Sequence, residues 1–369
     1  MTGTQRPDVA VVGAGVIGLT TAIELAERGL VVQVRTRSAP SQTTSAVASA
    51  MVGPSVAPAG EPAAAWERAS IETFTTLASV PGTGVALRRG RLAARASGPP
   101  LPGFEPCALG DLPEGFGSGF WATLPLVDMP VYLDYLVRRL EAADGRIEFG
   151  DLPHLTELAE VAPLLVNCAG LGARELVPDP TVRAVRGQQV IVDNPGLEEF
   201  FVEAPFSPSW AAYWPYPDHV VLGGTRTDGD ETLDPDPDLA EQILQRCIAV
   251  EPRLRQATVR AHQVGLRPAR PAPRLEAEQI SGARCVHNYG HGGGGVTCPG
   301  VAHARRLRCS PADQAAGACR RAANFRLCPR ARRPSSIRPT PAPAPGAAKG
   351  SPSWPAWRRS CGSSRSSTR

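Results

Sequence analysis

The 369-residue sequence contains no run of about 18 apolar residues, which is the length that a membrane-spanning helix needs. Its N-terminus has no charged segment followed by an apolar stretch, and Ala48-Ser49-Ala50 imitates a signal cleavage site without an apolar segment before it. The motifs G-x-S-x-G, G-x-x-x-x-G-K-[ST] and H-E-x-x-H do not occur, so nothing indicates nucleophilic catalysis, P-loop chemistry or zinc hydrolysis. We therefore expect a cytoplasmic protein with no membrane partner.

The sequence also has no C-x-x-C pair. Four cysteines are widely spaced through the first 297 residues (Cys107, Cys168, Cys247 and Cys285), and the other five follow Thr297. This spacing is typical of reduced cytosolic thiols and not of a disulfide framework or a zinc site.

Acidic residues are almost missing after Thr297. Residues 298–369 contain 14 arginines, Lys349 and one acid, Asp313, which is a net charge of +14 in a chain whose total is +4. The first 297 residues therefore have a net charge of −10, and this acidic composition does not indicate nucleic-acid binding.

The first strong motif lies at the N-terminus. Four apolar residues, Val9–Val12, predict a strand buried in a parallel sheet, and Gly13, Gly15 and Gly18 follow as G-x-G-x-x-G before a helix over 19–28. These glycines allow a tight turn, close approach of a pyrophosphate, and close packing of the helix on the strand. The sequence therefore predicts a dinucleotide site; the alternative is a glycine-rich turn without a ligand.

The second strand ends differently from that of an NAD-dependent dehydrogenase. Gly29 ends the helix and Val31–Val34 forms the strand, but no carboxylate follows it where one would bind the ribose hydroxyls. Arg37 occupies this position. It either contacts the 2′-phosphate of a dinucleotide or is a solvated arginine. The hydroxyl-rich loop Thr43, Thr44 and Ser45 comes next, and small residues follow it.

Further elements follow from apolar periodicity and turn residues. Helices are expected over 61–80, after Asp128 as the N-cap, and over 237–250. Strands are expected over 85–92, 147–149, 164–168, 182–192, 200–202, 211–214, 219–222 and 259–264. Gly223-Gly224 ends the strand over 219–222.

Two later stretches carry chemistry. In Gly265-Leu266-Arg267-Pro268, a stiff backbone holds an arginine whose guanidinium suits a carboxylate; the alternative is a surface arginine. In the stretch 287–297, four glycines after His291 leave backbone N–H groups open to a pyrophosphate or a flavin edge; the alternative is a flexible linker. His287 and His291 have metal-ligand spacing, but the glycines disfavour a helix there, so we expect no metal.

Taken in order, these stretches resemble the FAD-dependent D-amino acid oxidases of bacteria. The resemblance covers residues 8–297 and rests on the matching segments 11–19, 43–45, 124–129, 166–170, 185–188, 222–225, 265–276 and 287–297. The last two segments are the most specific. This family often has arginine after the second strand, which accounts for the missing carboxylate.

The resemblance implies oxidation of a D-amino acid by hydride transfer from Cα to flavin N5, with O2 reoxidising the flavin to give hydrogen peroxide. The imino acid then hydrolyses to a 2-oxo acid and ammonia. Arg267 would bind the substrate carboxylate, with Tyr213 and Gly293 also contacting the substrate. FAD would contact Gly13, Ala14, Gly15, Val16, Ile17, Gly18, Arg37, Thr43, Thr44, Ser45, Gly292, Gly293, Gly294, Gly295, Val296 and Thr297.

The chain departs from the family at the active-site tyrosine, which lies three residues before a proline. Ala212 occupies that position here, and Tyr213 precedes Pro215 by two residues. Either a one-residue gap restores Tyr213 to the site, or Tyr213 is an ordinary strand aromatic. The residues 49–55 also lack two aromatics that the family tends to have, which changes the pocket.

A larger departure follows Thr297, where the family continues with a sequence resembling Leu-Ser-Trp-Gly-Cys-Ala-Arg. Removing one C from the codon CTG in ACC CTG TCC TGG GGT TGC GCA CGC G gives a frame that encodes Thr-Cys-Pro-Gly-Val-Ala-His-Ala, which is residues 297–304 as they stand. We therefore hypothesise that residues 298–369 are translated out of frame. We expect such a tail to be disordered because it has few apolar residues.

The expected fold is α/β. A discontinuous FAD-binding Rossmann domain (1–60, 124–181 and 265–297) combines with an antiparallel substrate-binding domain (61–123 and 182–264), as a monomer or homodimer. Two alternatives to a D-amino acid oxidase stay open: a D-aspartate or glycine oxidase, and an inactive FAD-binding relic.

Overall fold

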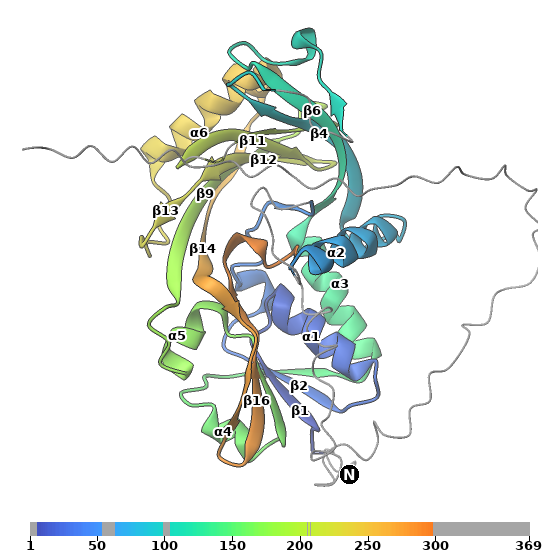
Figure 1. The fold of residues 1–369 in the computed structure, drawn as a ribbon, viewed down its shortest axis with the longest axis vertical. Coiled ribbons are helices and arrows are strands. Elements are labelled where there is room, and N and C mark those ends of the chain that lie inside the picture. Colours follow the sequence, from blue (N-terminus) through green and yellow to red (C-terminus); the bar gives the residue numbers. More distant parts are fainter. Residues whose placement is uncertain (1–5, 54–62, 99–103, 205, 207, 298–369) are drawn as a thin grey trace, which may run out of the picture.

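The computed structural model describes residues 6–53, 63–98, 104–204, 206 and 208–297. The expected out-of-frame tail, residues 298–369, lies outside these residues. The described chain forms two sheets stacked along the long axis of the molecule, and Figure 1 shows them below and above α2 (Ala63–Leu77). No helix of the described part is long and apolar enough to span a membrane.

The lower sheet has six strands in the order β15-β16-β8-β1-β2-β7. Its bounds are β1 Val9–Val12, β2 Val32–Thr36, β7 Arg146–Phe149, β8 Leu164–Asn167, β15 Ala277–Ile280 and β16 Ala283–His287. All neighbours are parallel except β15 and β16, which form a hairpin. β1 lies at the centre and is buried on both faces, as its unbroken apolar run predicts.

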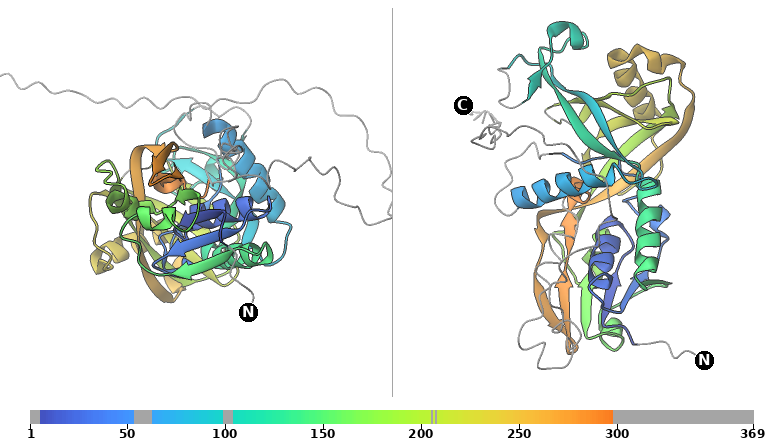
Figure 2. Two further views of the ribbon diagram at one scale, coloured as in Figure 1. Left: turned by 90° about the horizontal axis from the view of Figure 1, so that it is seen from below. Right: turned by 90° about the vertical axis from the view of Figure 1, so that its right-hand side faces the viewer.

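Helices cover both faces of this sheet, as the views in Figure 2 show. On one face α1 (Val16–Ala26) packs against α3 (Met129–Ala142), and both join the core around Val9 and Val11. On the other face α4 (Thr156–Ala159) covers Ala10 and Val12. The short α5 (Ala173–Leu176) follows β8. The C-terminal ends of β1 and β8 point toward the upper sheet.

The upper sheet is largely antiparallel, with the order β17-β14-β9-β12-β11-β10-β4-β6-β3. Its bounds are β3 Ala50–Met51, β4 Val85–Ala94, β6 Ser118–Val127, β9 Arg183–Asp193, β10 Phe200–Glu203, β11 Ser209–Pro215, β12 His219–Thr225, β14 Val259–Arg274 and β17 Tyr289–His291, with β5 Glu105–Pro106 and β13 Thr227–Asp228 beside it. β10 and β4 pair in parallel.

The two faces of the upper sheet have different neighbours. We call outer the face covered by α6 (Pro237–Val250), whose Ile243 and Cys247 pack with Val190 and Leu222. We call inner the opposite face, which carries Ile191, Val221 and Trp214 and turns toward the lower half of the molecule. Because side chains alternate along a strand, each residue of β9, β11 and β12 belongs to one of these faces.

Most expected elements are present, but three details differ. β12 continues through Gly223-Gly224 to Thr225, because that segment still pairs with β11. β14 runs ten residues beyond its expected end at Val264 and contains Arg267, because it pairs first with β9 and then with β17. Asp128 precedes α3, yet its side chain makes no capping hydrogen bond.

The expected domain boundaries at 124 and 265 fall inside β6 and β14. Both strands are long and lead from one half of the molecule toward the other, so neither has a break at the boundary.

Candidate functional site

The glycine-rich turn after β1 has the conformation that its three glycines allow. Gly13 has a φ of +98°, and a Cβ there would lie 2.6 Å from the Cys168 carbonyl oxygen. A Cβ on Gly18 would lie 1.8 Å from the Gly13 carbonyl oxygen, so α1 approaches the turn as closely as a glycine permits. Gly15 is the N-cap of α1, and its first turn consists of apolar residues. This helix N-terminus is therefore free to attract an anion.

The hydroxyl-rich loop lies against this turn and against the upper sheet. The Ser45 Oγ atom accepts a hydrogen bond of 3.0 Å from the backbone N–H of Val16. The Thr44 hydroxyl donates to the Leu266 carbonyl at 3.1 Å, and the Thr43 hydroxyl donates to the Pro40 carbonyl at 2.7 Å. The loop thus ties the N-terminus of α1 to β14, beside Arg267.

The loop of four glycines closes the other side of the site. Gly292–Gly294 form a short 3-10 turn, and Gly292 has a φ of +57°. A Cβ on Gly293 would lie 3.7 Å from the Arg267 Cδ, and one on Gly295 would lie 4.0 Å from Ile17 side-chain atoms. Segments far apart in the sequence therefore meet here.

Arg267 lies on the inner face of β14, opposite Val185 of β9. Its guanidinium rests on Gly187, where a Cβ would lie 2.5 Å from both terminal nitrogens. Nη1 donates to the carbonyls of Thr225 and Arg186 at 3.3 and 3.4 Å, and no acidic side chain of the described residues pairs with it. Partial burial, and secondarily the charge of Arg226, lower the pKa of Arg267.

Tyr213 lies on the outer face and does not reach Arg267. Its side chain is 1% exposed, packs on Phe201 at a ring distance of 6.0 Å, and belongs to the core under α6. Its hydroxyl accepts a hydrogen bond of 3.4 Å from Arg91 Nη2. Burial raises the pKa of this phenol well above its ordinary range. The side chain of Tyr213 therefore lies in the outer-face core, away from Arg267.

The aromatic residues of the inner face are ones that the sequence analysis did not single out. The inner-face core contains Trp210, Ala212, Trp214 and Tyr216, whereas Ala211 belongs to the outer-face core under α6. The period-2 alternation of β11 was the available signal, because it puts Ala212 and Tyr213 on opposite faces.

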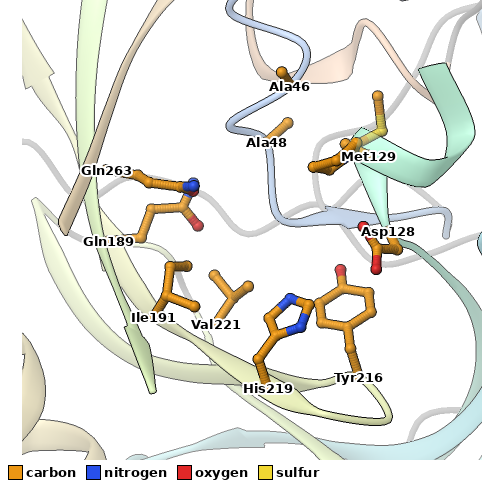
Figure 3. Close-up of a pocket in the computed structure, with 11 residues that line it drawn as sticks. Ala46, Ala48, Asp128, Met129, Gln189, Ile191, Tyr216, His219, Val221 and Gln263 are labelled. Atoms are coloured by element: carbon orange, nitrogen blue, oxygen red, sulfur yellow. The ribbon is translucent and has the colours of Figure 1, made fainter. Parts of the chain in front are cut away.

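A cavity of about 60 Å³ lies between the inner face and the segment after Ser45 (Figure 3). Ala46, Ala48 and Met129 line one side, and Gln189, Ile191 and His219 line the other. Gln189 Nε2 donates to the Val47 carbonyl, whereas its buried Oε1 has no partner in the described part of the chain. Burial raises the pKa of Asp128 at the rim.

The remaining predicted residues lie at the edge of the site or outside it. Arg37 directly follows β2 and is exposed. His287 is fully buried in the lower sheet, where its Nε2 lies 2.7 Å from Glu278 Oε1, and His291 Nε2 lies 2.9 Å from Asn288 Oδ1. The two histidines thus have separate partners and do not face a common point.

The fold and the glycine turn define an α/β protein of the dinucleotide-binding type, with a second, largely antiparallel sheet. A family model described as FAD dependent oxidoreductase matches residues 8–304, and the chain belongs to this family.

Individual relatives agree with this assignment. The chain is 45% identical over 305 residues to a D-amino-acid oxidase of Rubrobacter xylanophilus, and the alignment covers 80% of this chain and 94% of the relative. It is 35% identical over 315 residues to human D-aspartate oxidase, covering 78% of this chain and 90% of the relative. The structure of glycine oxidase from Geobacillus kaustophilus superposes with a TM-score of 0.72 and 19% identity over 84% of this chain and 94% of that one, which shows the α/β fold.

The residues present fit FAD. Gly13 and Gly18 allow the turn to pack closely on Cys168 and α1 to begin close to the turn, and the N-terminus of α1 suits a pyrophosphate. The glycines at 292–295 leave backbone N–H groups uncovered on the side of Arg267. The turn, the hydroxyl loop and the glycine loop would therefore hold the cofactor between the two sheets.

Proposed function

We propose that the chain oxidises D-amino acids to 2-oxo acids, with release of ammonia and hydrogen peroxide. The observation that carries this proposal is the placement of Arg267. A half-buried guanidinium without an acidic partner in the described chain lies beside the glycine loop and the hydroxyl loop. A partly desolvated cation of this kind favours an anionic ligand, and the planar guanidinium matches a carboxylate.

The protein's own groups bind and orient the substrate. Arg267 holds the carboxylate, and the backbone carbonyls of Arg186 and Thr225 keep its Nη1 in place. FAD, when bound, supplies the redox chemistry by accepting the two electrons and the hydrogen of Cα and passing the electrons to O2. Orientation of the substrate takes the place of a general base, because no histidine or carboxylate in the described residues contacts the Arg267 side chain that binds the substrate.

A D-aspartate oxidase is the second candidate, and the human relative supports it. A second carboxylate on the substrate would need a second cation near Arg267. Arg226 is close enough to lower the pKa of Arg267, but its Nε and Nη2 both donate to Asp228 Oδ1, at 3.3 and 3.0 Å. Because Asp228 balances this charge, the geometry favours substrates with one carboxylate.

The test is the visible spectrum of the purified protein mixed anaerobically with D-amino acids. We expect flavin bands that bleach on mixing and hydrogen peroxide when O2 is admitted. Arg267→Ala should raise KM by about 100-fold, because two charge-assisted hydrogen bonds are together worth about 3 kcal/mol. Arg226→Ala is the matched control and should change KM by less than about twofold. A colourless protein, even with FAD added, would favour the inactive relic.

We also propose a cytoplasmic location. Cys107, Cys168, Cys247 and Cys285 are free thiols, and the last three are buried. Burial raises the pKa of Cys168 to about 12, which keeps this thiol protonated and inert. Free thiols of this kind are typical of a reducing compartment.

A further inference from the structure

Trp210 is the aromatic side chain of β11 that lies nearest to the Arg267 carbonyl partners. Its indole ring covers Gly224, where a Cβ would lie 2.3 Å from Cε2 and Cζ2 of the ring. Gly224 directly precedes Thr225, whose carbonyl accepts the hydrogen bond from Arg267 Nη1. Consecutive Cα atoms are about 3.8 Å apart, so the indole covers the residue next to the one whose carbonyl holds the guanidinium.

Packing alone positions this indole. Its Nε1 is buried without a hydrogen-bond partner in the described part of the chain. The ring contacts Gly224 on one side and the half-exposed Phe206 ring at a centroid distance of 5.1 Å. Because Gly224 has no side chain, the indole can lie where a Cβ of residue 224 would otherwise be.

The expected tyrosine is also missing from this face, where Ala212 stands between Trp210 and Trp214. Trp214 packs on Gly223, where a Cβ would lie 3.1 Å from its Cζ3, one residue farther from Thr225. Of the inner-face aromatic residues of β11, Trp210 therefore contacts the position nearest to Thr225.

We propose that Trp210 limits the size of the substrate side chain, so that the chain oxidises D-amino acids with small, uncharged side chains and disfavours bulky ones. This inference rests on the proposed function. A carboxylate bound to Arg267 has its oxygens about 2.8 Å from the guanidinium nitrogens, and the substrate Cα is bonded directly to that carboxylate. The substituent on Cα therefore begins close to Thr225, and the indole on the neighbouring Gly224 restricts the room for it.

The experiment compares the holoenzyme with Trp210→Ala, Trp210→Phe and the control Trp214→Phe. One measurement is the ratio of kcat/KM for D-leucine to that for D-alanine. The other is binding of acetate and phenylacetate by calorimetry, which needs no turnover. We expect Trp210→Ala to raise the D-leucine ratio and the affinity for phenylacetate by about tenfold, with a smaller shift in the same direction for Trp210→Phe. Trp214→Phe should leave both within about twofold.

The two proposals fail in different ways. If the natural protein turns over no D-amino acid while Trp210→Ala still gains affinity for phenylacetate, the proposed function is wrong and the size limit stands. If folded Trp210→Ala and Trp210→Phe leave the ratio and the affinities unchanged, the size limit is wrong. Preference of the natural protein for D-leucine or D-aspartate over D-alanine would overturn it as well.

Discussion

A single glycine in β9 decides where the guanidinium of Arg267 lies. Gly187 leaves the space that the guanidinium fills, and a Cβ there would lie 2.5 Å from its nitrogens and 2.7 Å from Cζ. The atoms that must move belong to the end of a flexible side chain and not to the backbone. The fold therefore tolerates a methyl group at this position, but the carboxylate site does not.

We accordingly predict that Gly187→Ala raises KM for D-alanine by about tenfold or more, because the displaced guanidinium loses its alignment with the carboxylate. Steady-state kinetics and FAD absorbance measure the effect, with the melting temperature as a check on folding. Gly110→Ala is the control, because a Cβ at Gly110 meets nothing within 4 Å. Unchanged KM in Gly187→Ala would show that Arg267 does not bind the carboxylate from this position.

His287 predicts a pH dependence of stability. Burial lowers its pKa below 6.5, although the hydrogen bond to Glu278 opposes this shift. Below pH 6.5 the unfolded chain binds a proton at this residue that the folded chain does not, so the free energy of unfolding falls as the pH decreases. For one group the slope is at most about 1.4 kcal/mol per pH unit.

Thermal melts of the natural protein and His287→Gln between pH 8 and pH 5 measure this contribution. We expect the difference between the two melting temperatures to shrink or reverse as the pH decreases, because glutamine cannot take up the proton. Parallel curves for the two proteins would contradict the shifted pKa.

At the scale of one element, β11 shows why the active-site tyrosine was hard to place from sequence. Moving one residue along a strand transfers a side chain to the opposite face. The sequence left Tyr213 with two interpretations, and only pairing with β12 and β10 decides which face it occupies. Its neighbours under α6 are Phe201 and Cys247.

We predict that Tyr213→Phe keeps kcat/KM for D-alanine within about twofold, because the hydroxyl contacts Arg91 at 3.4 Å and not the inner face. Tyr213→Ala should instead lower the free energy of unfolding by about 3–5 kcal/mol, as expected for the loss of a buried aromatic ring. Kinetics and urea denaturation separate the two effects. A fall of kcat/KM by more than about tenfold in Tyr213→Phe would return this residue to the site.

Close packing at the junction of β1 and α1 leads to a prediction about FAD binding. A Cβ on Gly18 would lie 1.8 Å from a backbone oxygen, which cannot rotate away as a side chain can. Gly18→Ala should therefore push α1 away from the turn and weaken FAD binding by at least about tenfold. Flavin fluorescence titration measures the affinity. Gly172→Ala, where the nearest atom is 3.7 Å away, should bind FAD normally.

For the whole molecule, local patterns predicted more than pairings between distant segments. The run Val9–Val12 and its glycines predicted the central strand and the turn, because burial and backbone freedom are local requirements. The length of β14 and the hairpin of β15 and β16 depend on partners far along the chain, and no periodicity marked them. The alternation of β11 marks the face on which Trp210 lies, but the position of its indole depends on Gly224 of the neighbouring strand.

The sequence after Thr297 raises a question about the whole chain. The glycine loop that adjoins Arg267 and Ile17 leads directly into it, and Val296 is already part of the core around α1. The family match ends at residue 304, and residues 305–369 lie outside it. The out-of-frame hypothesis supplies a specific alternative in which Leu-Ser-Trp-Gly-Cys-Ala-Arg follows Thr297.

We predict that the chain with the frame restored binds FAD at least about tenfold more tightly than the natural chain and melts at a higher temperature. Its leucine and tryptophan would extend the apolar core at Val296, and full burial of one such side chain stabilises a protein by about 1.5–3 kcal/mol. Flavin titration and thermal melts of the two proteins measure the difference, and resequencing of the gene with an intact mass tests its origin. If the gene confirms the frame and both chains hold FAD equally well, the hypothesis is wrong and residues 298–369 belong to a working enzyme.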